Sequence, residues 1–161
     1  MKKIILSLFF AVTTFGFAFS QGNFSAGLDL GLPLGTPFSD FYSVGFGISG
    51  RYEAPIQTKL NWTATGGFLS FGGKTVTGFS VKSITMIPIQ GGIKYYFQKS
   101  NSGIYGDASL GLFFLSGSGS SETKVGFSPG FGYRSGKFDI LGRFNVVSDF
   151  NYFGIRGAYV F

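Results

Sequence analysis

The feature that most constrains the fold is a two-residue alternation at residues 153–161. Every second residue there is apolar or glycine: Phe153, Ile155, Gly157, Tyr159 and Phe161. In an extended strand these side chains share one face, because successive side chains point to opposite sides. A water-soluble protein rarely leaves such a face outermost, whereas a transmembrane barrel requires an apolar outer face with an aromatic rim. The stretch therefore predicts the closing strand of a membrane-spanning β-barrel.

The same alternation recurs earlier in the chain, at residues 24–34, 42–53, 60–71, 87–97, 104–114, 124–134 and 138–146. With the last stretch these segments predict an all-β fold, an eight-stranded antiparallel up-and-down transmembrane β-barrel. The third segment loses its phase near Gly66 and Gly67. Because a glycine inside a strand often marks a bulge, we predict a β-bulge there.

The composition agrees with many short strands and excludes several kinds of site. Only 12% of residues are charged, well below the roughly 25% of soluble domains, and glycine and aromatic residues are abundant. Cysteine and histidine are absent. Disulfides, thiol nucleophiles, Cys/His zinc sites and imidazole bases are therefore excluded. The formal charge of +6 is spread over single residues, which argues against a nucleic-acid-binding surface.

The first residues predict a leader rather than part of the barrel. Lys2 and Lys3 precede an apolar run from Ile4 to Phe19, and small residues occupy positions 18 and 20. We interpret residues 1–20 as a secretory signal peptide and residues 21–161 as the barrel domain. The alternative, an N-terminal membrane helix, is disfavoured because the run of about 16 residues is shorter than the roughly 20 needed to span a bilayer.

The connections between the predicted strands alternate in length. The short ones are 54–58, 98–102 and 135–137, and the longer ones are 35–41, 72–83 and 116–123. The last connection, 148–151, is as short as a turn. Outer-membrane barrels have tight periplasmic turns and longer external loops. The pattern predicts that the short connections are periplasmic and the others external.

A lipocalin-like secreted barrel is the main structural alternative, because it also has eight strands but keeps its apolar face inside. An eight-stranded barrel is only wide enough for modest side chains, and the apolar face here carries large residues on every strand. The opposite face is mainly Gly and Ser, which fit inside. Aromatic residues also form a predicted girdle at one rim: Phe24, Tyr52, Trp62, Tyr95, Phe97, Tyr133, Phe138, Tyr159 and Phe161. We therefore predict that the apolar face is outside.

Charged residues fall on the inward phase of the strands: Asp29, Arg51, Glu53, Lys94, Asp107, Lys124, Arg134, Asp139, Arg143 and Arg156. Because isolated enclosed charges are costly, we expect ion pairs. Depth along the strands predicts that Asp29 meets Arg156 and Arg143 at the seam between the first and last strands, with Asp107 near Lys94 as a second cluster. This lumenal charge network predicts a salt-bridged plug. A narrow water-filled conduit and a catalytic group are the alternatives.

Catalysis is the weaker of these alternatives. A nucleophile needs an adjacent base, and without histidine only a carboxylate or lysine could serve. We predict a non-enzymatic protein without cofactor or metal.

In pattern and ending the chain resembles the small eight-stranded outer-membrane barrels of the OmpA transmembrane-domain and OmpX-like type, over residues 23–161. The resemblance implies a bacterial outer-membrane location, outer-membrane lipid as surroundings, and recognition of the C-terminal strand by the barrel-assembly machinery. The residues matching that assembly signal are Phe153, Ile155, Tyr159 and Phe161. No peptidoglycan-binding domain follows the barrel, so wall anchoring is not implied. The expected role is envelope structure or surface interaction through external loops; the alternative is a narrow small-solute channel.

Deletion of Phe161 should separate recognition from burial. We expect insertion in cells to be impaired more strongly than refolding into detergent, because the resemblance implies that the assembly machinery recognises this residue. Refolding in vitro should lose only the burial of one aromatic side chain, about 1.5 to 3 kcal/mol. The measurements are the amount of heat-modifiable protein in the outer membrane and the refolded fraction in vitro. Equal impairment in both settings would make Phe161 an ordinary girdle residue.

Overall fold

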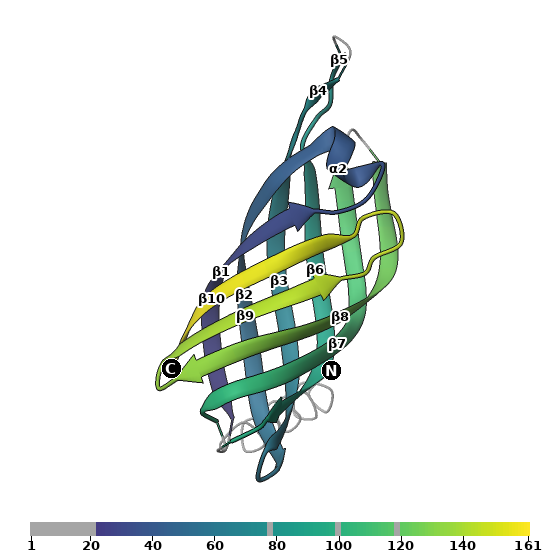
Figure 1. Ribbon diagram of the computed structural model, residues 1–161. Coiled ribbons are helices and arrows are strands. Elements are labelled where there is room, and N and C mark those ends of the chain that lie inside the picture. The colour runs from purple at the N-terminus through teal and green to yellow at the C-terminus, as the bar shows by residue number, and fades with distance from the viewer. Residues whose placement is uncertain (1–21, 77–78, 99–100, 118–119) are drawn as a thin grey trace, which may run out of the picture.

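The computed structural model describes residues 22–76, 79–98, 101–117 and 120–161, so the predicted signal peptide lies outside the described residues. Antiparallel strands close into one barrel (Figure 1). Its strands are β1 (Asn23–Pro33), β2 (Tyr42–Gln57), β3 (Leu60–Gly73), β6 (Ile84–Tyr96), β7 (Gly103–Gly117), β8 (Ser120–Ser135), β9 (Phe138–Asn145) and β10 (Tyr152–Val160). The predicted eight-stranded up-and-down barrel is confirmed.

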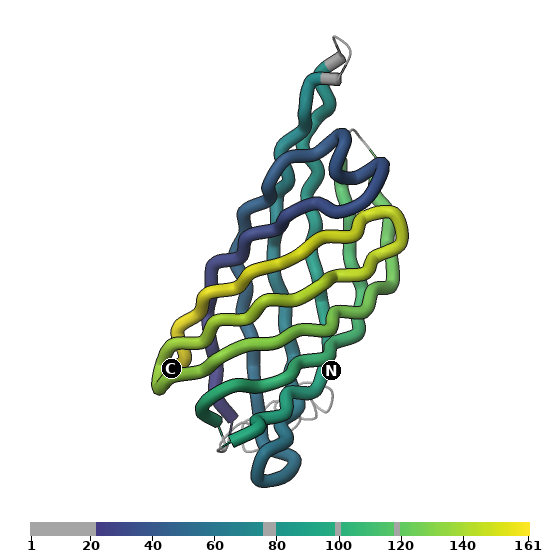
Figure 2. The backbone as a smooth tube through the Cα atoms, viewed as in Figure 1, coloured from purple at the N-terminus to yellow at the C-terminus, as the bar shows by residue number. Residues whose placement is uncertain are grey.

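The barrel closes where its first and last strands pair. In the register of β1 and β10, Asp29 lies opposite Arg156, and Ser25 lies opposite Val160. Each remaining barrel strand pairs with the strands that precede and follow it around the barrel, in the order β1, β2, β3, β6, β7, β8, β9, β10. Figure 2 shows that the strands run obliquely around the barrel, as closure of a small sheet requires.

The outer wall is apolar, as the alternation predicts. The most exposed of its large apolar side chains are those of Leu28, Phe131, Phe138 and Phe161, which are 72%, 69%, 68% and 69% exposed. Exposed apolar residues on this scale are found on surfaces that face lipid. Aromatic rings meet along one rim, for example Phe24 with Phe161 at a centroid distance of 6.0 Å. The predicted girdle therefore lies on the outer wall.

The bulge predicted in β3 is wrong. Gly66 and Gly67 pair with Gly50 and Ser49 of β2 without a shift of register. The burial pattern of β3 continues its alternation beyond them, and Leu69 and Phe71 are buried inside the barrel. The pattern seemed to lose its phase because apolar residues occupy the inward positions at this end of the strand.

The two ends of the barrel differ. The turn end contains the tight connections at residues 58–59 and 136–137 and both ends of the barrel sequence, where the Phe161 amide donates to the Phe24 carbonyl at 2.9 Å. The loop end carries α2 (Phe38–Phe41), β4 (Thr75–Val76) and β5 (Phe79–Ser80). The β4–β5 hairpin projects beyond the barrel (Figure 1). Among the described residues, no helix has the length and apolarity to cross a membrane.

Single cysteines can establish which end faces outward, because the chain contains none of its own. Thr75 in β4 and Thr58 in a tight turn are both exposed. On intact cells we expect a membrane-impermeant maleimide to label the Thr75→Cys variant, and to label Thr58→Cys only after the outer membrane is permeabilised. The reverse labelling would mean that the barrel is inverted.

Candidate functional site in the barrel lumen

The lumen holds nearly all the charged residues predicted to face it. Nine of them are buried: Asp29, Arg51, Glu53, Lys94, Asp107, Arg134, Asp139, Arg143 and Arg156. Lys124 is the exception. It pairs with Glu122 at 3.1 Å in a partly exposed position on β8. The candidate site is therefore a network of enclosed charges rather than a pocket on a loop.

Lys94 organises the cluster nearest the turn end. Its Nζ lies 3.0 Å from Glu53 and 2.6 Å from Asp139, and its side chain has no exposed surface. The ring of Tyr105 lies over the same ammonium, with its centroid 3.9 Å away. The hydroxyl of Tyr96 donates to Glu53 at 2.9 Å, and that of Tyr105 donates to Asp139. The buried ammonium is thus surrounded by acceptors and a π face, as an enclosed cation requires.

Glycine in the wall makes room for these large side chains. A Cβ at Gly132 of β8 would lie 2.2 Å from the ring of Tyr105. Nearer the loop end, a Cβ at Gly126 would lie 2.5 Å from the ring of Phe113. Both distances are far below van der Waals contact, so the rings rest on bare backbone. The glycine-rich inner face therefore leaves space for a few large lumenal side chains.

Arg51 and Asp107 form the next layer. Arg51 Nη1 lies 2.9 Å from Asp107 Oδ2, and Nη2 lies 3.5 Å from Oδ1. Arg51 Nε donates to Thr65 at 2.9 Å, and Ser109 donates to Asp107 at 3.2 Å. Two parallel N–H to carboxylate bonds fix both partners in orientation as well as distance.

Asp107 lies beside Lys94, as predicted, but the two charges do not pair with each other. The two residues lie opposite each other in the register of β6 and β7, but their charges meet other partners. Lys94 pairs with residues of β2 and β9, and Asp107 pairs with Arg51 of β2. The lumen is narrow enough for long side chains to reach strands that are not adjacent. Strand neighbourhood alone therefore does not determine the ion pairs.

At the seam, Asp29 contacts one predicted arginine directly and the other through a serine. Arg143 Nη2 lies 3.8 Å from Asp29 Oδ1. Ser49 donates to Asp29 at 2.5 Å and accepts from Arg156 Nε at 2.8 Å. Arg156 Nη2 also donates to the hydroxyl of Ser25 at 3.1 Å. The structure thus brings the three charged residues of the seam together, with Ser49 as a bridge that the sequence did not suggest.

Neutral polar residues continue the network from the seam toward the loop end. Arg143 donates to Gln90 at 3.1 Å, and Gln90 donates to Ser128 at 2.7 Å. Ser128 in turn donates to Asn145 at 2.8 Å. Polar side chains from β6, β8 and β9 are thereby joined across the lumen.

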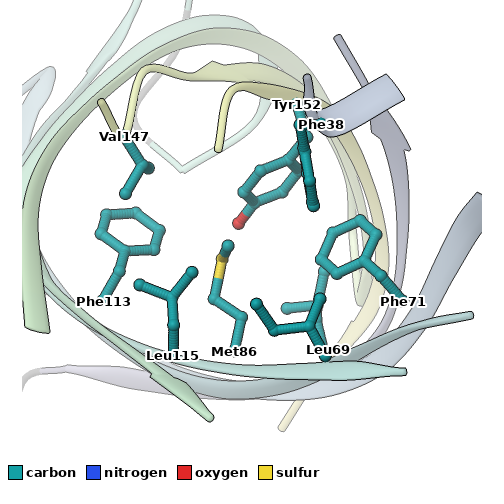
Figure 3. Close-up of a cluster of buried hydrophobic side chains, with 9 residues drawn as sticks. Phe38, Leu69, Phe71, Met86, Phe113, Leu115, Val147 and Tyr152 are labelled. Carbon is teal, nitrogen blue, oxygen red and sulfur yellow. The ribbon is translucent and has the colours of Figure 1, made fainter. Parts of the chain in front are cut away.

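Apolar side chains fill the lumen at the loop end. We name this cluster the apolar plug; its members are Phe38, Leu69, Phe71, Ile84, Met86, Phe113, Leu115, Val147 and Tyr152. Figure 3 shows side chains from opposite walls pointing toward one another across the opening. Phe38 comes from α2 and is 1% exposed. Its ring contacts those of Phe71 and Phe150 at centroid distances of 5.1 and 5.4 Å.

The apolar plug was missed in the sequence, although a signal for it exists. Leu69, Phe71, Phe113 and Leu115 occupy inward positions near the loop ends of β3 and β7. Apolar residues on both phases of a strand end indicate that both of its faces are covered there. Phe38 had no such signal, because it lies on a connection that was expected to be an external loop.

The four residues of the predicted assembly signal lie on the outer side of β10 and its end. Phe153 is half-buried, while Ile155, Tyr159 and Phe161 are 39%, 40% and 69% exposed. The rings of Tyr159 and Phe161 contact each other at 5.5 Å. Their role in assembly stays a prediction. In the described ranges no group of three or more Asp or Glu residues is placed to hold a metal ion.

A double-mutant cycle can test the strongest lumenal pair. Arg51→Ala and Asp107→Ala should each destabilise the barrel by about 3 to 5 kcal/mol, because each leaves an enclosed charge without its partner. The double variant should cost less than the sum. Urea unfolding in detergent measures all three.

The Lys124–Glu122 pair, at a similar distance but partly exposed, is the matched control. Its coupling should stay within about 1 kcal/mol. Additive costs for Arg51 and Asp107 would contradict the paired arrangement.

Comparison with known proteins supports the fold. No protein-family model and no curated protein matches the chain. Among solved structures, it is similar to Ail, the attachment invasion locus protein of Yersinia pestis, in complex with the heparin analogue sucrose octasulfate. The identity is 14%, the match covers 87% of this chain and 97% of that chain, and the TM-score is 0.56.

Two further structures give the same result. Neisserial surface protein A is 16% identical, with 86% of this chain and 94% of that chain covered and a TM-score of 0.55. The outer-membrane protein OprG of Pseudomonas aeruginosa is 12% identical, with 88% and 96% covered and a TM-score of 0.53. The chain thus has the fold of the small eight-stranded outer-membrane barrels, as its resemblance to the OmpA and OmpX type implied.

Proposed function

We propose that the protein is a non-enzymatic integral outer-membrane barrel whose lumen is closed to solutes, and that it serves the envelope structurally or through contacts made by its loop end. One observation carries the proposal. The lumen is filled by its own side chains, with ion pairs toward the turn end and the apolar plug toward the loop end.

The apolar plug is the stronger barrier to solutes. Met86, Phe71 and Phe113 have no exposed surface, and the hydroxyl of Tyr152 is the one polar side-chain group among the residues of the apolar plug. A hydrated ion crossing such a layer would lose most of its water and gain at most this one hydroxyl as a partner, which is how apolar constrictions close channels. The polar half contributes less to closure, because its groups could be rehydrated.

The outer wall supports a membrane location. Large apolar side chains are exposed on every barrel strand, for example Leu28, Ile48 and Ile140 at 72%, 62% and 60%. Aromatic side chains gather at the turn end, which matches the interfacial girdle of outer-membrane barrels. We infer the bacterial outer membrane from this wall, from the alternating sequence and from the shared fold.

The loop end supports a role in surface contact. The β4–β5 hairpin extends beyond the barrel (Figure 1), and Lys74 and Lys82 are exposed near its base. The similar structure of Ail was determined with a heparin analogue bound to that protein. For the present chain we propose the loop end as the contact surface. In the lumen the carboxylates are held by cations or hydroxyl donors, which argues against a catalytic role there.

Planar-bilayer recording tests the closed lumen against the alternative, a narrow small-solute channel. We expect the refolded wild-type protein to show no steady single-channel steps. The Phe71→Ala/Phe113→Ala variant should admit water and show current, because it removes two rings from the apolar plug. Phe131→Ala, which removes a ring from the outer wall, is the matched control and should remain silent. Steady steps from the wild-type protein would overturn the closed-lumen proposal.

A further inference from the structure

The enclosed charges of the lumen do not balance. Among the residues that the structure describes, five buried cations, Arg51, Lys94, Arg134, Arg143 and Arg156, face four buried carboxylates, Asp29, Glu53, Asp107 and Asp139. In a closed interior each uncompensated charge is costly. The excess is one positive charge, and the geometry of the ion pairs shows where it lies.

Four of the cations have a carboxylate within 4.0 Å. Arg51 pairs with Asp107, and Lys94 pairs with Glu53 and Asp139. The remaining two pairs join Arg134 to Glu53 at 3.7 Å and Arg143 to Asp29 at 3.8 Å. Within the described part of the chain, no carboxylate lies this close to Arg156, which is 1% exposed.

The guanidinium of Arg156 is also only partly hydrogen-bonded. Nε donates to Ser49, and Nη2 donates to the hydroxyl and carbonyl of Ser25, at 2.8, 3.1 and 3.4 Å. Nη1 is buried, and the described residues offer it no acceptor. Its two N–H groups therefore need an acceptor from outside the chain.

The carboxylate opposite Arg156 in the strand register, Asp29, already has other partners. Asp29 already accepts from Ser49 and pairs with Arg143. Ser25, which accepts from Arg156, itself donates to the carbonyl of Arg51. Arg156 therefore contacts two serines, and the carboxylate opposite it pairs with Arg143 instead.

We propose that the lumen binds one small monovalent anion, of the chloride class, at Nη1 of Arg156. A water molecule would accept hydrogen bonds from Nη1 but would leave the positive charge uncompensated. An anion would accept the hydrogen bonds and also compensate the charge. The site lies within a narrow lumen crossed by side chains from several strands. A monatomic ion therefore fits it better than a phosphate or carboxylate ligand. This ligand goes beyond the proposed envelope role and does not depend on it.

Unfolding in two salts tests the site. The refolded protein in an uncharged detergent is titrated with urea in chloride and in gluconate at equal ionic strength, because gluconate is too large for the lumen. The urea midpoint should be higher in chloride. A site filled to about 99% would raise the ratio of folded to unfolded protein about 100-fold.

Two variants locate the effect. Arg156→Gln should abolish the difference between the two salts. Arg134→Gln is the matched control: it also removes one buried cation but leaves Arg156 intact, and it should keep the difference. No difference in the wild-type protein, a difference that survives Arg156→Gln, or a loss of the difference in Arg134→Gln would each overturn the proposal.

If Arg156→Gln does not fold, crystallography of the wild-type protein tests the site instead. Wild-type protein crystallised in bromide should show an anomalous peak within hydrogen-bonding distance of Arg156 Nη1. A map with anomalous peaks elsewhere and none at this position would overturn the proposal.

Discussion

Closure of eight strands into a barrel with an apolar outer wall is the constraint on which the rest of the structure depends. The outer wall takes most of the large apolar side chains, and the circumference leaves an interior only a few side chains wide. Whatever points inward must fill that space without strain and satisfy its own polar groups. The glycines under Tyr105 and Phe113 show how tightly the interior is packed, since a methyl group at either glycine would overlap the ring.

The lumen meets this constraint in two different ways along its length. Toward the turn end it uses charges that neutralise one another across the barrel, as Lys94 does with Glu53 and Asp139. Toward the loop end it uses apolar packing, with Phe38 of α2 inserted between the walls. Ion pairs specify which strands face each other, because a wrong register would separate the partners, whereas the apolar plug excludes water. Together they fill the lumen and join its strands.

The sequence predicted the features that follow from the two-residue alternation of the strands. It predicted the side-chain contacts across the lumen only in part. The alternation predicted the eight strands and the inward charges, and depth along the strands brought Asp29 near Arg143 and Arg156. The ion pair of Asp107 with Arg51 was not predicted, because long side chains in the lumen reach beyond the adjacent strand. The false bulge at Gly66 and the missed apolar plug share one cause: Leu69 and Phe71 are apolar on the inward phase.

The closed lumen that we propose would leave recognition of a partner to the surfaces of the barrel. Most of the enclosed charges pair with one another, so a protein partner would meet the outer wall, the turn end or the loop end. The outer wall is a uniform apolar surface that offers lipid contact but little discrimination. The loop end departs from the regular barrel, because β3 and β6 are joined through the β4–β5 hairpin and because α2 is held there by Phe38. Packing of Phe38 into the plug therefore links the interior to the surface. A residue that fills the lumen also anchors the first connection of the loop end, which is the surface that we propose for contact with a partner.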